Sequence, residues 1–226
     1  MNYLFVVAHP DDEVLGAGAT IYTLLQEGHN VSICSLSSKC RTRYDMSTDE
    51  LLDRMKDSHD ILDIKNSVYG NYGCLFFKDE PHQEMVEFVE RCMIDTKAEV
   101  IITNHPSDLN NDHYITSIVC QEAARLSQRQ ITNVTPLKRL LYMEVPSSTD
   151  WYLNTGWGAF KPNTYFGVSK EAMQKKIDSL LVYSNVIRKP PHPRSVQSLE
   201  ALAVYRGSQC GHEYAEAFEL VFQIGV

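Results

Sequence analysis

Strand-like and helix-like patterns alternate along the first half of the chain, and this alternation constrains the fold more than any other feature. Short apolar runs, typical of strands covered on both faces, are separated by segments whose apolar residues recur at helical spacing. Such alternation favours right-handed strand–helix–strand units and a mostly parallel sheet. The expected strands are residues 2–8, 30–36, 74–77 and 98–104, and the expected helices are residues 14–26, 49–62, 82–94 and 113–126.

The second half of the chain is less regular. Strands are expected at residues 137–145 and 163–168, a helix at residues 170–183, and a closing helix and strand between residues 196 and 224. No internal repeat, low-complexity tract or linker divides the sequence. We therefore predict a single α/β domain over residues 1–226, with a mostly parallel sheet flanked by helices.

The charge balance and the cysteines narrow the class of protein. The formal net charge is −8, from 21 lysines and arginines against 29 aspartates and glutamates, so we expect no nucleic-acid partner. The six cysteines lack the spacing of a disulfide framework, and we expect reduced thiols in a cytoplasmic protein. We also expect no signal peptide and no membrane span, because no apolar stretch approaches the about 20 residues needed.

Two polar clusters follow the two most apolar strands. The first is "AHPDDE", residues 8–13, and the second is "TNHPSDLNNDHYIT", residues 103–116. In open α/β sheets, ligands bind outside the carboxyl ends of the strands, so we expect the two clusters to be neighbours in space. Together they offer His9, Asp11, Asp12, His105, Asp108, Asp112 and His113.

These residue types can bind a divalent cation. Crowded carboxylates are unfavourable unless a cation or a proton lies among them. A catalytic zinc takes three protein ligands, for which two histidines and one aspartate suffice, and a further carboxylate can then act as a base. Adjacent Asp11 and Asp12 suit this division because successive side chains point in different directions. The alternative is an acidic helix N-terminus that caps backbone amides without a metal, and spacing alone leaves both open.

The "AHPDDE" motif and the downstream "DLNNDH" resemble the zinc-dependent PIG-L/LmbE-like N-deacetylase family. "YAEAF", residues 214–218, is similar to a segment near the end of many members. The resemblance implies a Rossmann-like fold and an enzyme that removes acetyl or related acyl groups from amino sugars and their conjugates. It also implies that His9, Asp12 and His113 bind zinc and that Asp11 is the general base. Other divalent ions stay open, because two histidines and an aspartate accept them.

The second motif departs from the family pattern at Asn110, where many members have a histidine. An amide can donate a hydrogen bond to an oxyanion, but it cannot protonate a leaving amine. We therefore expect Asn110 to stabilise the oxyanion and Asp11 to act twice, first as base and then as acid. His105 and His192 are the alternative acids.

Further residues are candidates for substrate binding. The resemblance implies an arginine after the second expected strand, for which Arg43 is preferred over Arg41 and Arg54. His192 and Arg194 lie in the proline-punctuated loop "RKPPHPRS", residues 188–195, and suit a phosphate or carboxylate on the substrate. The remaining candidates are Asp112, expected to orient a metal ligand, Asp108, expected to do the same or to bind a sugar hydroxyl, and Tyr214 and Glu216, which the resemblance places near the site.

Other features leave alternatives open. Trp151, Trp157 and Phe160 can form a carbohydrate platform or a contact between subunits of a homo-oligomer. His29, His59 and His82 are interpreted as surface residues. The expected substrate is a small N-acylated amino sugar. A different N-acyl conjugate, such as a thiol conjugate or an antibiotic intermediate, and a non-catalytic sugar-binding module are the alternatives, because fold does not fix substrate.

Overall fold

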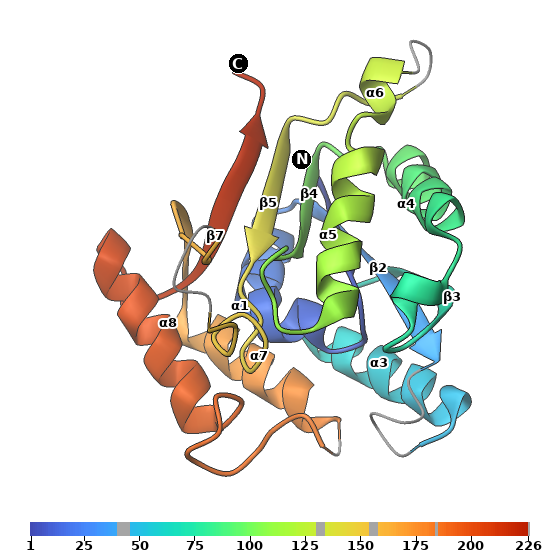
Figure 1. Cartoon of the computed structure of the whole chain (residues 1–226). Helices are drawn as coiled ribbons and strands as arrows, with labels where there is room; N and C mark the ends of the chain where they lie inside the picture. The colour runs from blue at the N-terminus through green and yellow to red at the C-terminus, as the bar shows by residue number, and fades with distance from the viewer. Residues whose placement is uncertain (40–45, 130–133, 154–157, 184, 226) are drawn as a thin grey trace.

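A computed structural model describes residues 1–39, 46–129, 134–153, 158–183 and 185–225 of the chain. Within these ranges seven strands form one sheet in the order β3-β2-β1-β4-β5-β7-β6 (Figure 1). The strands from β3 to β5 are parallel, and β7 is antiparallel to both β5 and β6. This confirms the predicted α/β class. The strands are β1 (Asn2–Val7), β2 (Asn30–Lys39), β3 (Asn66–Gly73), β4 (Val100–Asn104), β5 (Arg139–Met143), β6 (Thr164–Val168) and β7 (Tyr214–Gln223).

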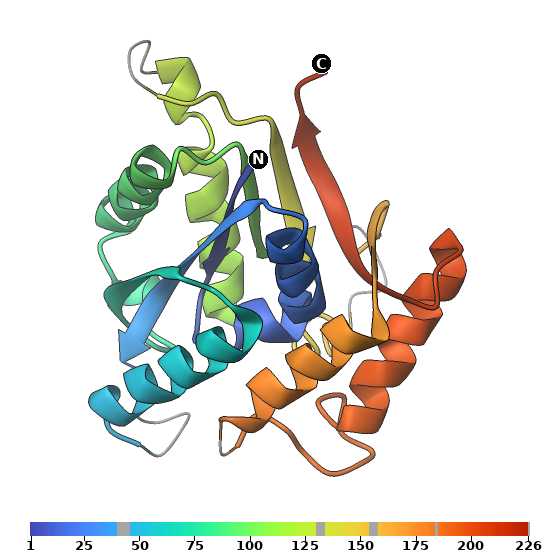
Figure 2. The same ribbon diagram turned by 180° about the vertical axis from the view of Figure 1, so that it is seen from behind.

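Helices cover both faces of the sheet. α4 and α5 pack on one face, and α1, α3 and α7 pack together on the other, as the front and back views show (Figures 1 and 2). α8 packs against β7 and β6. None of the helices in the described ranges is long and apolar enough to cross a membrane. The helices are α1 (Asp12–Gln26), α3 (Thr48–Leu62), the 3-10 turn η1 (Phe77–Asp79), α4 (His82–Thr96), α5 (Asn111–Ala123), α6 (Leu126–Arg129), α7 (Lys170–Leu181) and α8 (Val196–Cys210).

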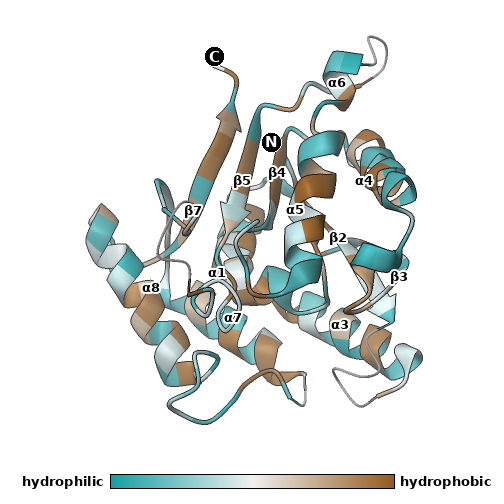
Figure 3. Cartoon of the chain, viewed as in Figure 1, coloured by the Kyte–Doolittle hydropathy of each residue, from teal (hydrophilic) through white to brown (hydrophobic). Residues whose placement is uncertain are grey.

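Each face of the sheet has its own hydrophobic core. Alternate residues of β1 point to opposite faces, so that Phe5 packs beneath α1 and α3 while Leu4 packs beneath α4 and α5. Both side chains are at most 1% exposed. Hydrophobic residues fill much of β4, β5 and β7, and they alternate with hydrophilic residues around α5 and α8 (Figure 3). The apolar runs of the sequence are therefore long enough to build strands covered on both sides.

The strand order reverses between β1 and β4. β1 has β2 on one side and β4 on the other, and the helices that follow β1 and β4 lie on opposite faces of the sheet. Such a switch point leaves a crevice outside the carboxyl ends of the two strands. The residues that follow these two ends are the two polar clusters of the sequence.

One expected strand is wrong. β3 is Asn66–Gly73, whereas residues 74–77 lead into the turn η1. β3 lies at the edge of the sheet, and most of its residues are partly or fully exposed. Because such a strand need not bury apolar side chains, it lacks the apolar run that would have marked it in the sequence. Gly70 permits its close approach to β2, because a Cβ atom there would lie 2.3 Å from the carbonyl oxygen of Leu36.

Candidate metal centre and active site

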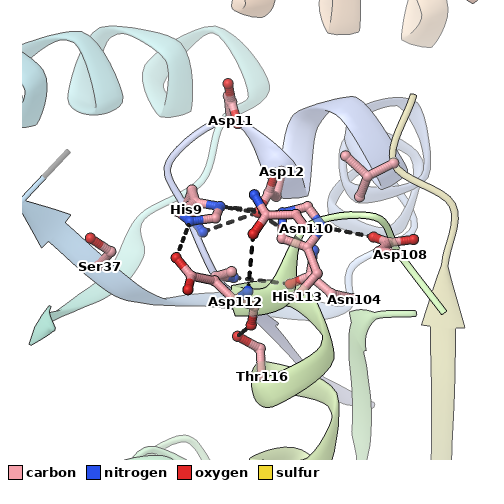
Figure 4. Close-up of polar contacts among 12 residues, drawn as sticks. His9, Asp11, Asp12, Ser37, Asn104, Asp108, Asn110, Asp112, His113 and Thr116 are labelled. Carbon is pink, nitrogen blue, oxygen red and sulfur yellow. Dashed lines mark hydrogen bonds and ion pairs between the residues drawn. The ribbon is translucent and has the colours of Figure 1, made fainter. Parts of the chain in front are cut away.

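Three buried ligand atoms converge at the switch point. His9 follows β1, Asp12 begins α1, and His113 lies in the first turn of α5. Asp12 Oδ2 is 3.3 Å from His9 Nδ1 and 3.1 Å from His113 Nε2, and the two ring nitrogens are 3.2 Å apart (Figure 4). All three residues are fully buried. The predicted proximity of the two clusters is therefore confirmed, and these atoms form a group able to hold a metal ion.

A second carboxylate holds the far side of each imidazole. His9 Nε2 lies 2.9 Å from Asp112 Oδ2, and His113 Nδ1 lies 2.6 Å from Asp108 Oδ2. Asp112 is itself fixed by the backbone N–H groups of Leu75 and Phe77. With the outer nitrogens donating to carboxylates, the inner nitrogens are left as acceptors, which is the arrangement found in metal-binding histidines.

The geometry fits a tetrahedral cation. Zinc bonds to nitrogen and oxygen are about 2.0–2.2 Å long, which separates neighbouring ligand atoms by about 3.3–3.5 Å. The observed separations of 3.1–3.3 Å lie close to this value. Two imidazoles and one carboxylate also match the chemistry of a catalytic zinc site, which keeps one position open.

The electrostatics of the group favour a positive charge at its centre. Burial lowers the pKa of His113, but Asp12 and Asp108 outweigh it and raise that pKa to about 9. Burial would likewise raise the pKa of Asp12, but His113 and His9 hold it well below its usual range. Asp12 is thus an anion that requires a cationic neighbour, either a protonated imidazole or a metal ion.

Asp11 faces away from the three ligand atoms. Its φ of 92° lies in the left-handed region, which turns its side chain away from that of Asp12 (Figure 4). Asp11 stands at the N-terminus of α1 but makes no capping hydrogen bond through its side chain, so the helix-capping interpretation fails for it. Arg194 Nη1 lies 3.6 Å from Asp11 Oδ2, and Asp11 is fully buried.

The proline-punctuated loop supplies Arg194 and His192. Arg194 Nε donates to the carbonyl oxygen of Pro146 at 3.2 Å and to Ser147 Oγ at 2.7 Å. His192 Nδ1 accepts the backbone N–H of Arg194 at 3.0 Å, and its ring packs edge-on against Trp151. Burial lowers the pKa of His192, and the nearby arginines add to this effect. His192 is therefore held as a neutral ring with its proton on Nε2.

A cavity of about 560 Å³ lies beside the ligand group. Four predicted site residues line it, namely Asn110, Asp112, His192 and Arg194. Asn110 caps α5, where its Oδ1 accepts the N–H of Asp112 at 2.9 Å, so its amide nitrogen remains as the donor. The other lining residues are Leu75, Leu109, Asn111, Ser147, Ser148, Trp151 and Arg188. Of these, the sequence analysis had assigned a role only to Trp151; Leu109 and Asn111 lie within the "DLNNDH" motif, and Arg188 shares a loop with Arg194.

Two predicted substrate-binding residues lie elsewhere. Glu216 is buried beside α1, where it pairs with Lys176 at 2.5 Å and accepts the N–H of Thr20 at 2.7 Å. Tyr214 packs against a small core formed by residues of α1, β6, α7 and α8. Neither lines the cavity, so the geometry does not support the proximity that the "YAEAF" segment implied.

Three of the remaining candidates, His105, His59 and Arg54, do not line the cavity. His105 does not line the cavity, because its ring packs against Tyr142 and Phe160 and its Nε2 is 3.4 Å from Glu219. His59 was expected at the surface, but it is 3% exposed and its Nε2 lies 2.9 Å from Glu13. Arg54 is exposed on α3. Arg41, Arg43 and Trp157 lie outside the described residues.

Comparisons with known proteins identify the family of the chain. The PIG-L family model, described as GlcNAc-PI de-N-acetylase, matches residues 4–124, which is more than half of the chain. The uncharacterized deacetylase YaiS of Escherichia coli (strain K12) is 26% identical over 188 residues, covering 78% of this chain and 87% of that protein.

Solved structures share the fold. GalB, the 4-carboxy-2-hydroxymuconate hydratase of Pseudomonas putida KT2440, matches with a TM-score of 0.80 and 17% identity over 100% of this chain and 98% of that one. The N,N'-diacetylchitobiose deacetylase of Pyrococcus horikoshii matches with a TM-score of 0.75 and 17% identity over 97% and 83%. At such identities the likeness concerns the fold alone.

Proposed function

Because the chain belongs to the PIG-L family of de-N-acetylases, we propose that it is a metal-dependent hydrolase that removes an N-acetyl or related N-acyl group from a small amino-sugar compound. The observation that carries this proposal is the convergence of His9, Asp12 and His113, with a carboxylate behind each histidine. The fold would not suffice, because a hydratase shares it.

His9, Asp12 and His113 would hold the metal, for which zinc is the first candidate. When bound, zinc lowers the pKa of a water molecule towards about 7 and polarises a carbonyl group. Asp108 and Asp112 keep the two imidazoles in the ligating tautomer and orientation. Other divalent ions are compatible with this donor set, and their availability would decide between them.

Asp11 would serve as the general base. Its carboxylate is fully buried and lies 3.6 Å from Nη1 of Arg194, which lines the cavity. The carboxyl group would accept a proton from the attacking water and then deliver it to the leaving amine. A positioned base of this kind contributes about 10²–10⁴-fold to the rate. His192, which lines the cavity, is the alternative acid, and it would first have to take up a second proton against its lowered pKa in order to donate one.

Asn110 would stabilise the developing oxyanion. Its side-chain oxygen is committed to the N-terminus of α5, which directs the amide nitrogen to the remaining space in the cavity. One donor of this kind contributes about 10²–10³-fold to turnover. This role uses the hydrogen-bonding capacity of Asn110 without asking it to transfer a proton.

The cavity wall favours a second candidate among the amide hydrolases. Leu75, Leu109 and Trp151 line it and are 52%, 60% and 45% exposed. Such a wall suits an N-acyl conjugate with an apolar part as well as a simple sugar.

We further propose that the domain extends over residues 1–226, since β5, β7 and β6 complete the same sheet. We also propose that the protein works in the cytoplasm.

Metal content and acetate release test the proposal together. The purified protein should contain about one zinc per chain and release acetate from members of a panel of N-acetylated sugars. Asp11→Asn should retain the metal but lose at least about 10²-fold in kcat. His113→Ala should lose the metal. Asp53→Asn, which removes one negative charge at an exposed position on α3, should change neither the metal content nor kcat.

Each result has a distinct meaning. Bound zinc without acetate release from any sugar would favour the different N-acyl conjugate. A chain that binds no metal would overturn the proposed mechanism and favour the sugar-binding module. Full activity of zinc-loaded Asp11→Asn would show that another group is the base.

A further inference from the structure

One wall of the cavity is built by a single loop that carries two arginines. Arg188, His192 and Arg194 all line the cavity, and all belong to residues 188–195. The backbone N–H of Arg188 donates to the carbonyl oxygen of Arg194 at 3.2 Å, and that of Ser195 donates to His192 at 2.9 Å. These bonds close the loop on itself, so side chains six positions apart in sequence meet at one wall.

The charge of Arg194 is largely committed within the protein. Its Nε donates to Pro146 and to Ser147, its Nη1 lies 3.6 Å from Asp11, and its side chain is 14% exposed. Arg194 therefore balances the buried carboxylate of Asp11 while its remaining N–H groups border the cavity.

The charge of Arg188 is not balanced in this way. Arg188 is exposed at the cavity and forms no ion pair with any residue in the part of the chain that the structure describes. The acidic side chain among the lining residues, Asp112, is bonded to His9 and to two backbone N–H groups. Asp150 also faces His192, but it accepts the N–H of Ser147 and does not line the cavity. A chain of net charge −8 thus places beside its candidate site a cation that has no ion-pair partner among the described residues.

An aromatic surface lines the same cavity as this cation. Trp151 is 45% exposed, lines the cavity, and contacts the ring of His192 with 5.2 Å between centroids. A flat apolar face in the same cavity as a guanidinium suits a ring that carries an acidic group.

We propose that the cavity selects substrates with an anionic group, a carboxylate or a phosphate, which Arg188 binds together with the remaining N–H groups of Arg194. The preferred substrates are then acidic N-acylated amino sugars, with the ring against Trp151 and the acyl group toward His9, Asp12 and His113. This inference rests on the proposed function for the fate of the acyl group, but the anion subsite stands on the cavity wall alone.

Matched pairs of compounds test the subsite. One pair is N-acetylglucosamine and its 1-phosphate, and the other is phenyl and 4-carboxyphenyl N-acetylglucosaminide. We expect the wild type to show at least about tenfold higher kcat/KM for the acidic member of one pair, as one charge-assisted hydrogen bond can provide. The pair with the larger ratio identifies the anion. Arg188→Gln should bring that ratio close to one, mainly through a change in KM. Lys189→Gln, which removes one positive charge at an exposed position of the same loop, should preserve the ratio.

Binding separates failure of the subsite from failure of the proposed function. The same four compounds are titrated against the wild type and Arg188→Gln by tryptophan fluorescence. If no acetate is released but the acidic members bind tighter and Arg188→Gln removes that difference, the subsite is supported and deacetylation of these sugars is not. Equal kcat/KM and equal binding for both members of each pair would overturn the subsite, and so would an equal loss in Arg188→Gln and Lys189→Gln.

Discussion

Two groups of buried charges lie along α1, one at its N-terminus and one near its middle, and they differ in how their charges balance. At the N-terminal end, three carboxylates surround two imidazoles. Even with both imidazoles protonated, this group would keep a negative charge. Further along, α1 departs from helical geometry at Ala17, and Glu216 accepts the freed N–H of Thr20 while pairing with Lys176. That second pair is neutral as a unit.

The difference shows which buried charges point to a ligand. In the pair, Lys176 Nζ donates to Glu216 and to the carbonyl oxygen of Leu15 at 2.8 Å, so a cation and an anion satisfy each other within the protein. In the group around Asp12, the two inner nitrogens face each other and a carboxylate, which requires a proton or a metal between them. Burial of charge is common to both, and it is the imbalance that marks a binding site.

Removing the cation from the neutral pair should give the largest effect. Lys176→Met leaves Glu216 buried without its partner, and we expect the free energy of unfolding to fall by about 3–5 kcal/mol. Urea unfolding of the metal-free protein measures this change. The zinc content of the folded variant should stay at the wild-type level, because neither residue touches the ligand atoms.

Two further variants make that test specific. Lys176→Met combined with Glu216→Gln should recover part of the lost stability, since glutamine carries no charge but still accepts the N–H of Thr20. Lys170→Met, exposed on the same helix, should change stability little. A double variant as unstable as the single one, or a single variant that loses zinc, would contradict the separation of the two groups.

Weakening the outer carboxylate of the candidate metal centre should have an intermediate effect. Asp108→Asn replaces the acceptor 2.6 Å from His113 Nδ1 by a neutral group of the same shape. We expect zinc to bind about 10–100-fold more weakly, because the carboxylate fixes the orientation and basicity of the imidazole. Competition with a chromophoric chelator measures the affinity, with Asp53→Asn as the control. Unchanged affinity would mean that His113 does not ligate through Nε2.

The positions of the strands and the candidate ligand residues were predictable to different extents. The apolar runs located β1, β2, β4 and β5, because strands covered on both faces must be apolar throughout. β3 was placed too late in the sequence, since an edge strand is held by backbone pairing with β2 and needs few apolar side chains. His9, Asp12 and His113 were predicted as ligands through the resemblance of two short motifs to a known family, and their proximity was predicted because both motifs follow strand ends.

Contacts between distant segments were not predictable from the sequence. The pairing of Lys176 with Glu216 joins α7 to β7, and no local pattern indicates it. His59 was interpreted as a surface residue because a single histidine on an amphipathic helix gives no sign of the buried Glu13 that it meets. Arg188 was passed over for the same reason, since only the closure of its loop places it at the cavity.

We expect the smallest effect at His105, which is buried yet belongs neither to the group around Asp12 nor to the pair of Lys176 and Glu216. Burial lowers its pKa from the ordinary value of 6.5, and Asp108 and Glu219 only partly oppose this. Its depressed pKa means that the unfolded chain binds the proton first as pH falls below 6.5, so stability is lost on acidification through the folded pKa. His105→Asn, which retains an acceptor for the N–H of Ser107, should show a shallower loss of unfolding free energy between pH 7 and pH 5, an interval set by the about 6.5 of free histidine. The exposed variant His82→Asn should follow the wild-type curve. Identical slopes for His105→Asn and the wild type would contradict the lowered pKa, because His105 would then bind its proton equally well in the folded and the unfolded chain.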